Sequence, residues 1–410
     1  MKPAASRLQI GFESLATEIV LTVLDEITDL PTLHGLINAS PVAFRLFGQH
    51  GVGIVESILN SGNTTKRIPE IIRLITLIRS SSLPIHSLEE FQYRVLSQSM
   101  VQQRTSAAFI PGALPRDASP IVLRSILASA TKISYLTSNC LDFYLGKLAA
   151  IEPEVLVDEK FSYRQGHPPH LSTIQAWKMR PEGQKLKLGK VEQASWIEVQ
   201  RVERAFWRVE FFHDLKVAAA RPLLSWPGDD LARLKRIQPK DFYSKTSYAE
   251  HEEIKTIVNY LDILRTGDSA SLPVTTKLPD VLPKQLESPP TCPLSMPGDS
   301  DHDHLLIPAP GYSHWRGLSG HFDSPLRCIS FDPFRRLGFA LWSRHRMTSL
   351  GLLKPPNQGP GSKSTDYYFF VWKSILSDDE ISDFEMSNKE REQRGGMPPL
   401  LEHLGRLGLH

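Results

Sequence analysis

The stretch "LATEIVLTVLDEITDLPTLHGLINAS", residues 15–40, carries the most regular apolar pattern in this chain. Apolar and polar residues alternate with the 3.6-residue period of an α-helix, which predicts an amphipathic helix over residues 14–27. Asp29 is placed to cap a second helix, in whose first turn Pro31 is tolerated. Ser40 followed by proline is a third helix-start signal. The chain is therefore expected to open with three successive helices.

The first of these helices has an unusually wide apolar side. Its apolar arc exceeds the ~100° stripe of a helix that packs on a single surface. A second protein could cover the excess, or later helices of the same chain could cover it. The residues on this arc are Leu15, Ile19, Val20, Val23, Leu24 and Ile27.

The rest of the chain also has mainly helical patterns. The third helix is expected to end at the glycines of residues 48–53, where another helix begins at Ile54. Further helices are predicted over residues 68–79, 87–103, 119–150 and 195–220, and no period-two alternation is sustained. The fold class is therefore expected to be mainly α.

The helix from Ser195 is predicted in most detail. Ser195 and Glu198 have the spacing of a capping box, and two apolar rows rich in aromatic residues follow. Such a helix is typical of the centre of a core. Its arginines and the acidic pair that follows later in the chain are expected on solvated faces; they are Arg201, Arg204, Arg208, Glu252 and Glu253.

Shifts in composition predict five segments. Residues 11–60 form the three-helix module and residues 61–265 an irregular helical domain. Residues 266–310 are rich in proline and serine, which predicts a disordered linker. Residues 311–385 are rich in aromatic residues and are expected to pack back on the helical domain. Residues 386–410 form a polar tail.

Composition excludes several classes of protein. The 47 basic and 45 acidic residues give a net charge of +2, so nucleic acid and membrane are not expected partners. The three cysteines are widely spaced, which excludes a disulfide framework and fits a reducing compartment. No apolar run reaches the ~20 residues of a membrane span. The protein is expected in the cytoplasm or nucleus.

Two short motifs are candidates for a metal site and a phosphate-binding loop. The segment "DHDH", residues 301–304, holds two possible metal ligands but lies inside the predicted linker, without a held scaffold. The segment "GPGSKS", residues 359–364, departs from a phosphate loop because a serine separates its last glycine from the lysine. No catalytic residue, metal site or cofactor is predicted, and the protein is not expected to be an enzyme.

Residues 11–58 resemble the F-box, a three-helix module. The family pattern begins Leu-Pro-x-Glu and continues through apolar pairs to Asp-Leu-Pro-x-Leu. This sequence departs from it at Ala16, which replaces the proline, and at Phe44, which is one position late. The matching residues are Leu15, Glu18, Ile19, Leu21, Val23, Leu24, Ile27, Leu30, Pro31, Leu33 and Leu36.

The resemblance implies an interaction rather than a reaction. F-box helices pack on the adaptor subunit of Skp–cullin–F-box ubiquitin ligases, and the remaining chain presents a substrate protein. The residues that it assigns to adaptor binding are Leu15, Glu18, Ile19, Val23, Leu30, Pro31, Leu33 and Leu36.

The later segments "SWIEVQRVERAFWRVEFF" and "PFRRLGFALWSRHRM" are similar to parts of large filamentous-fungal proteins that open with an F-box-like module. Those proteins have no assigned activity to carry over. Two other functions stay open from the residues alone. One is a helical structural or scaffold protein without adaptor binding, and the other is an enzyme of an unrecognised class.

Overall fold

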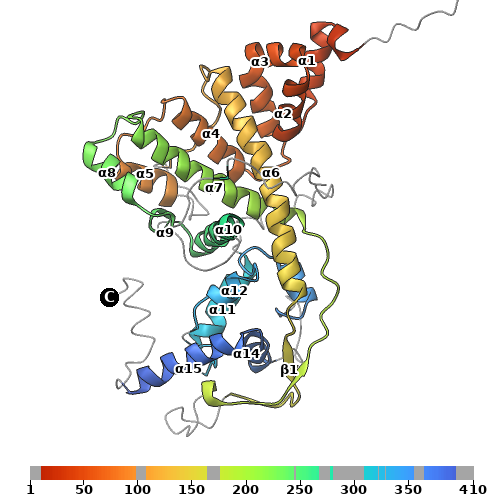
Figure 1. Ribbon diagram of the computed structural model, residues 1–410, viewed down its shortest axis with the longest axis vertical. Coiled ribbons are helices and arrows are strands. Elements are labelled where there is room, and N and C mark those ends of the chain that lie inside the picture. Colours follow the sequence, from red (N-terminus) through yellow and green to blue (C-terminus); the bar gives the residue numbers. More distant parts are fainter. Residues whose placement is uncertain are drawn as a thin grey trace, which may run out of the picture. The chain divides into compact units, whose positions relative to one another are not determined.

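The structure is a computed structural model of the 410-residue chain. The prediction of a mainly α fold is confirmed, since helices dominate and only one two-stranded sheet lies among the described residues (Figure 1). The described residues are 11–97, 108–163, 176–243, 246–266, 278–279, 309–321, 323–327, 329–354 and 364–393.

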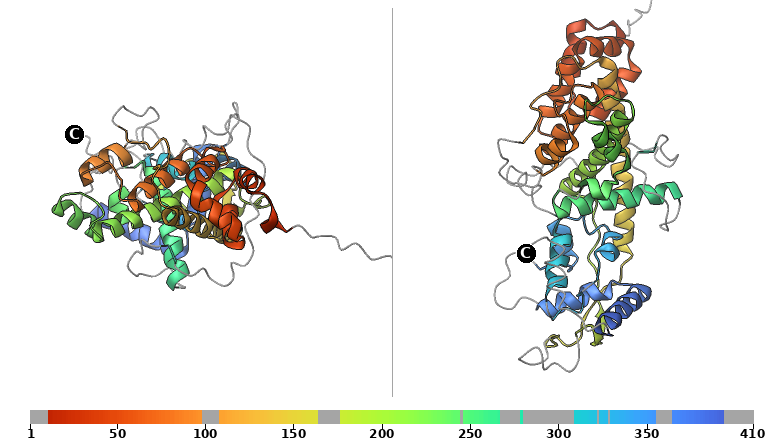
Figure 2. Two further views of the ribbon diagram at one scale, coloured as in Figure 1. Left: turned by 90° about the horizontal axis from the view of Figure 1, so that it is seen from above. Right: turned by 90° about the vertical axis from the view of Figure 1, so that its left-hand side faces the viewer.

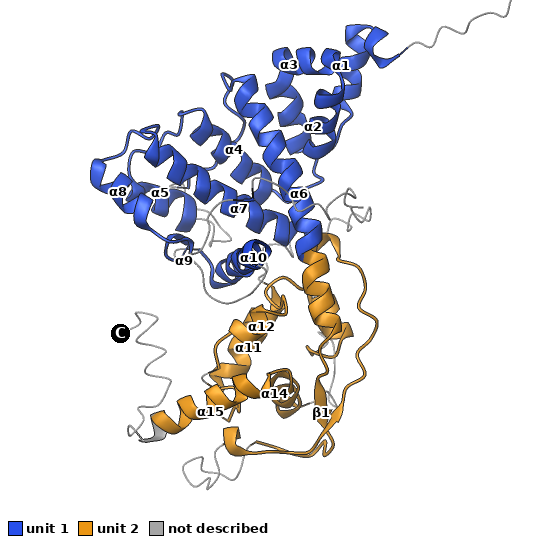
Figure 3. Cartoon of the chain, in the orientation of Figure 1, with its two compact units in different colours: residues 1–140, 199–306 blue, residues 141–198, 307–410 orange. Residues whose placement is uncertain are grey.

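The chain divides into two compact units, which Figure 3 colours separately. The first comprises residues 1–140 and 199–306, and the second comprises residues 141–198 and 307–410. The C-terminal residues thus group with 141–198, a stretch inside the predicted helical domain. Composition marks where an apolar pattern stops, but it does not show which distant segments pack together. The grouping therefore differs from the five predicted segments.

The three opening helices form as predicted, with a short 3₁₀ turn in front. The turn covers Phe12–Ser14, and α1 covers Thr17–Asp25, α2 Leu30–Ala39 and α3 Pro41–Asn60. Both α1 and α2 pack on α3, and the three lie together in Figures 1 and 2.

The predicted caps of α2 and α3 are confirmed. The Asp29 carboxylate accepts a hydrogen bond of 2.7 Å from the backbone N–H of Thr32, and the Ser40 hydroxyl accepts one of 3.1 Å from that of Ala43. Each cap satisfies a backbone donor that the first helical turn would otherwise leave unpaired. These two caps set the starts of α2 and α3.

The predicted break at the glycines of residues 48–53 is wrong, because α3 runs through them to Asn60. A Cβ atom at Gly51 would lie only 3.1 Å from the Leu123 side chain and 3.2 Å from the Phe47 ring. Gly51 therefore permits the close approach of α3 to Leu123. A helical glycine costs about 0.5–1 kcal/mol, less than burying one large apolar side chain contributes. Phe47 and Ile54 are both buried.

The first unit continues with helices around α7, although α6 after residue 140 and α7 before residue 199 belong to the second unit. The predicted helices over 68–79, 119–150 and 195–220 are confirmed. The predicted helix over 87–103 is helical as far as Ser97 and contains a π-helical turn, and residues 98–103 lie outside the described residues. The elements are α4 Arg67–Arg79, α5 Leu88–Phe91, the π-helical turn Gln92–Leu96, α6 Pro120–Ala149, α7 Trp196–Ala220, α8 Gly228–Arg236, α9 Pro239–Phe242 and α10 Tyr248–Thr266.

The prediction that the α7 arginines and the α10 acids are solvated is wrong. Arg201, Arg204 and Arg208 are all buried, as are Glu252 and Glu253. Arg204 Nη2 lies 2.6 Å from Glu253 Oε2. Helical periodicity identified the apolar rows of α7 but carried no information about its remaining side. A second helix covers that side, and charged side chains are rarely buried unless they are paired.

Arg208 repeats this arrangement one turn further along α7. Its Nη2 lies 2.9 Å from Oε1 of Glu250, and both side chains are largely buried. Two ion pairs therefore join α7 to α10, and three of their four groups, Arg204, Arg208 and Glu253, were predicted to face solvent.

A second buried charge cluster centres on Arg79 at the end of α4. Its Nη2 lies 2.7 Å from Glu210 Oε1 and 2.9 Å from Asp214 Oδ2. Its Nη1 donates to the hydroxyl of Ser125 at 3.0 Å, and Nη2 also lies 3.1 Å from the hydroxyl of Ser129. Burial raises the pKa of Asp214 to about 6, the Arg79 charge opposes this shift, and the Glu210 charge adds to it. One guanidinium therefore compensates two carboxyl groups.

Asp214 is expected to make the protein more stable in mild acid. Its folded pKa of about 6 exceeds the ~3.9 of an unfolded aspartate, so the folded state holds the proton more tightly between these values. The free energy of unfolding should then fall by up to about 3 kcal/mol as pH rises through that window. Asp214→Asn should flatten this dependence in urea titrations at pH 4.5 and 7. Asp262→Asn, in a more exposed pair with Arg265, is the control. Equal slopes in wild type and Asp214→Asn would contradict the assignment.

The second unit contains the sheet and an aromatic core. Strands β1 Glu154–Leu156 and β2 Gly183–Lys185 pair antiparallel, with Val155 opposite Gln184, and α14 packs on β1. The rings of Phe334 and Phe339 lie 4.8 and 5.0 Å from that of Trp372. The other elements of the second unit are the 3₁₀ turn Ala176–Lys178, α11 Pro310–Gly320, α12 Asp332–Arg335, α13 Arg344–Ser349, α14 Thr365–Ser374 and α15 Asp378–Gln393.

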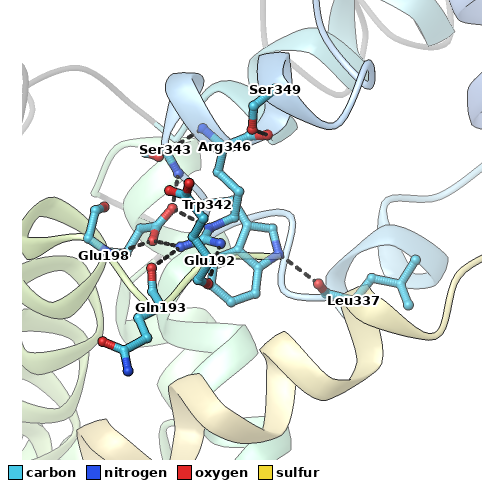
Figure 4. Close-up of polar contacts among 9 residues, drawn as sticks. Glu192, Gln193, Glu198, Leu337, Trp342, Ser343, Arg346 and Ser349 are labelled. Atoms are coloured by element: carbon cyan, nitrogen blue, oxygen red, sulfur yellow. Dashed lines mark hydrogen bonds and ion pairs between the residues drawn. The ribbon is translucent and has the colours of Figure 1, made fainter. Parts of the chain in front are cut away.

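An ion pair between Glu198 and Arg346 lies buried in this unit (Figure 4). Glu198 accepts hydrogen bonds from Arg346 Nε at 2.8 Å and Nη2 at 2.7 Å, and from the backbone N–H of Ser343 at 2.9 Å. It also accepts one from the N–H of Ser195 at 2.8 Å, which is one of the two contacts of the predicted capping box. The other contact is not formed, because the buried Ser195 hydroxyl has no hydrogen-bond partner among the described residues. Burial opposes ionisation of Glu198, but these donors and the Arg346 charge hold its pKa below the ordinary value.

Several predicted segments fall partly or wholly outside the described residues. These include most of the 266–310 linker, the "DHDH" segment and residues 359–363 of "GPGSKS". Ser364 is described, and its hydroxyl caps α14 through the N–H of Tyr367. Residues 386–393 of the predicted polar tail form the end of α15, which extends to Gln393. No helix among the described residues is long and apolar enough to cross a membrane.

Candidate protein-interaction site

Helix α1 divides its wide apolar arc between the core and the surface. Val20 and Leu24 are fully buried, whereas Ile19 is 50% exposed and Val23 is 38% exposed. Ile19 and Val23 are four residues apart and therefore neighbours on one helix face. Later helices of the chain leave this face uncovered among the described residues. We call these two residues the α1 apolar pair.

The other residues that the resemblance assigned to adaptor binding do not share one surface. Leu30 and Leu33 are buried, and Leu33 is 0% exposed, so both belong to the core of the three-helix module. Leu15, Pro31 and Leu36 are half-buried, and Glu18 is exposed. A sequence pattern shows which positions are apolar, whereas the packing of α2 on α3 decides which of them are covered.

The surface around the α1 apolar pair is acidic. Between residues 11 and 30 the chain carries no lysine, arginine or histidine. The acidic residues of this stretch are all exposed, and they are Glu13, Glu18, Asp25, Glu26 and Asp29. An apolar pair within an acidic surface is complementary to an apolar site with lysine or arginine at its edge.

A second exposed apolar group was not among the predicted site residues. Phe44 of α3 is 44% exposed, and the guanidinium carbon of Arg124 lies 4.6 Å from its ring centroid, a cation–π arrangement. Ile121 precedes Arg124 by three residues on α6 and is 72% exposed. The shifted position of Phe44 relative to the F-box pattern was the one signal that could have singled it out.

Among the described residues there is no cluster of three or more histidine, cysteine, aspartate or glutamate side chains that could hold a metal. Cys140 is buried and unbonded, and burial raises the pKa of its thiol. His314 is also largely enclosed, by the rings of Tyr368 and Trp372, and burial lowers its pKa to about 4. A neutral thiol and a neutral imidazole in such surroundings are typical of core residues.

Comparison with known proteins finds no family model that matches this chain, and no curated protein or solved structure that matches it. The F-box resemblance therefore rests on the residues of 11–58 alone.

Proposed function

We propose that residues 11–60 are an F-box-like interaction module that binds the adaptor subunit of a Skp–cullin–F-box ubiquitin ligase. The remainder of the chain would then present a substrate protein, and the chain would have no catalytic role. The observation that carries this proposal is the exposure of Ile19 and Val23 on a helix whose opposite face is fully buried.

Three features support a partner at this face. The helices α1, α2 and α3 pack into a module whose core is already filled by Val20, Leu24 and Leu33. The exposed pair is therefore not needed for the internal packing of the module. Burying a fully exposed aliphatic side chain contributes roughly 1.5–3 kcal/mol to binding. Ile19 and Val23 are only partly exposed, so each would contribute less than this. Both residues also stand at positions that the F-box pattern requires to be apolar.

Changing the α1 apolar pair to Ile19→Asp with Val23→Asp is expected to reduce adaptor capture at least tenfold. Each aspartate would place a charge in a desolvated contact, and both positions already face solvent in the free chain. Co-purification with the recombinant adaptor measures the effect, and circular dichroism checks the fold. Leu33→Ala would not test the surface, because it leaves a cavity in the core and lowers the free energy of unfolding by about 2–5 kcal/mol.

The matched control is Leu223→Asp with Leu264→Asp, which changes two aliphatic residues of similar exposure outside the module. This control should leave adaptor capture unchanged. No capture by the unmodified chain would reject the adaptor and favour the alternative of a helical scaffold protein. Equal capture by both double variants would place the binding surface elsewhere.

A further inference from the structure

A small pocket of about 60 Å³ in the first unit is lined by charged and apolar side chains. Its walls come from α4, the π-helical turn after α5, residues 109–111, α7 and Tyr243. Three of the lining residues are arginines, namely Arg67, Arg94 and Arg208, and Glu70 is the one lining acid among the described residues. π-Helical turns occur frequently at functional sites.

Arg67 is the least compensated of the three arginines. Its side chain is only 14% exposed, and its one ion pair among the described residues joins Nη1 to Glu70 Oε2 at 3.5 Å. That distance exceeds the 2.7–2.9 Å typical of a charge-assisted hydrogen bond. Burial lowers the pKa of Arg67, and the positive charges of Arg208 and Arg204 add to this effect against the acids Glu70 and Glu250.

The other two arginines differ in how far their charge is satisfied. Arg94 pairs with Glu90 at 2.7 Å, and both side chains are about one-third exposed. Arg208 pairs with Glu250 through Nη2, but its buried Nε has no hydrogen-bond partner among the described residues. The pocket therefore combines one weakly paired guanidinium with an unused buried donor on a second.

Among the described residues, Glu70 is the one acid that forms an ion pair with Arg67. Burial raises the pKa of the Glu70 carboxyl group, and the nearby charges of Arg67 and Arg73 oppose this shift. Residues 98–107 connect the two sequence segments that line the pocket beside Arg94 and Phe109, and they contain no aspartate or glutamate. Residues 98–107 therefore supply no acidic side chain to Arg67.

We propose that this pocket binds an oxyanion, the phosphate or carboxylate group of a small molecule, between Arg67 and Arg208. Guanidinium groups match the geometry of both anions through paired N–H donors. The volume of about 60 Å³ exceeds what one water needs and is well below the ~150 Å³ of a cavity that holds benzene. The anionic group of the ligand therefore enters the pocket. Apolar lining residues such as Leu74 and Phe211 contact the ligand atoms next to that group.

The test is the affinity of the full chain for inorganic phosphate and for acetate, by isothermal titration calorimetry at constant ionic strength. Arg67→Met should weaken the preferred anion at least tenfold, because it removes the guanidinium and keeps much of the side-chain volume. Glu70→Gln should leave affinity unchanged or increase it, because it removes the opposing charge. Preference for phosphate over acetate would identify the group, and the reverse order would identify a carboxylate.

Arg265→Met is the control, since Arg265 lies in the same unit in a partly exposed pair with Asp262, away from the pocket lining. It should bind the anion as the unmodified chain does. If Arg67→Met loses its fold by circular dichroism, Arg67→Lys keeps the charge without the paired donors and should weaken binding several-fold. Absence of saturable binding to both anions, or equal weakening by Arg265→Met, would overturn the proposal. The adaptor-binding variants should not alter this affinity.

Discussion

Replacing Glu198 by glutamine is expected to destabilise the protein by about 3–5 kcal/mol, the cost of leaving one member of a buried ion pair without its partner. The Glu198 carboxylate is fully buried and accepts from Ser195, Ser343 and Arg346 (Figure 4). A glutamine side chain keeps the shape, but its NH₂ group would face donors instead of accepting from them. Arg346 would lose its counter-charge and one of its two hydrogen bonds to this side chain, and it would keep the glutamine oxygen and the carbonyl oxygens of Glu192 and Gln193 as partners.

The matched control is Glu380→Gln in the same unit. Glu380 pairs with Arg336 at 2.8 Å, but both side chains are partly exposed, so the pair is worth about 0–1 kcal/mol. Urea unfolding followed by circular dichroism measures both variants. A loss at Glu198 no larger than the loss at Glu380 would show that the buried pair does not hold the second unit together.

Replacing Trp207 by alanine is expected to cost about 3–5 kcal/mol through lost apolar burial and the cavity that remains. Trp207 is 0% exposed and lies in α7, beside the equally buried Phe206. Tryptophan has the largest side chain, so its replacement by alanine would leave a large cavity in the core of the first unit. Trp207→Phe should cost less, because much of the ring volume is retained.

Tyr248→Ala serves as the control for Trp207, since Tyr248 is an aromatic residue of the first unit that is 49% exposed. Its removal should shift the unfolding midpoint only slightly, as surface substitutions usually do. Comparable midpoints for the two alanine variants would show that the aromatic rows of α7 do not form the centre of this core.

The local elements were largely predictable because their signals lie within a few residues of one another. The capping residues Asp29 and Ser40 bond to N–H groups three positions later, so their role can be read from the sequence. The buried rows of α7 follow the helical period in the same way. The predicted break at the glycines of α3 was wrong, and the packing partner of Gly51, Leu123, lies about seventy residues away in the sequence.

The sequence predicts that the candidate interaction site lies on a helix, but it does not predict which apolar residues of that helix are exposed. The apolar positions of α1 can be read from the sequence, but the split between buried Val20 and exposed Ile19 depends on where α3 lies. The anion pocket had no signal at all, since its lining residues come from segments spread between Arg67 and Tyr243. Only folding brings those segments together.

By itself, the sequence determined that the chain is helical, where its main helices begin, and which faces are apolar. These properties depend on contacts within one or two helical turns, where residue order and physical distance coincide. The tertiary structure alone decided that Arg204 meets Glu253, that Glu198 meets Arg346, and that the C-terminal residues group with residues 141–198. Those outcomes depend on partners far apart in the chain, and a charged residue shows no sign in the sequence of whether it will face water or a counter-charge.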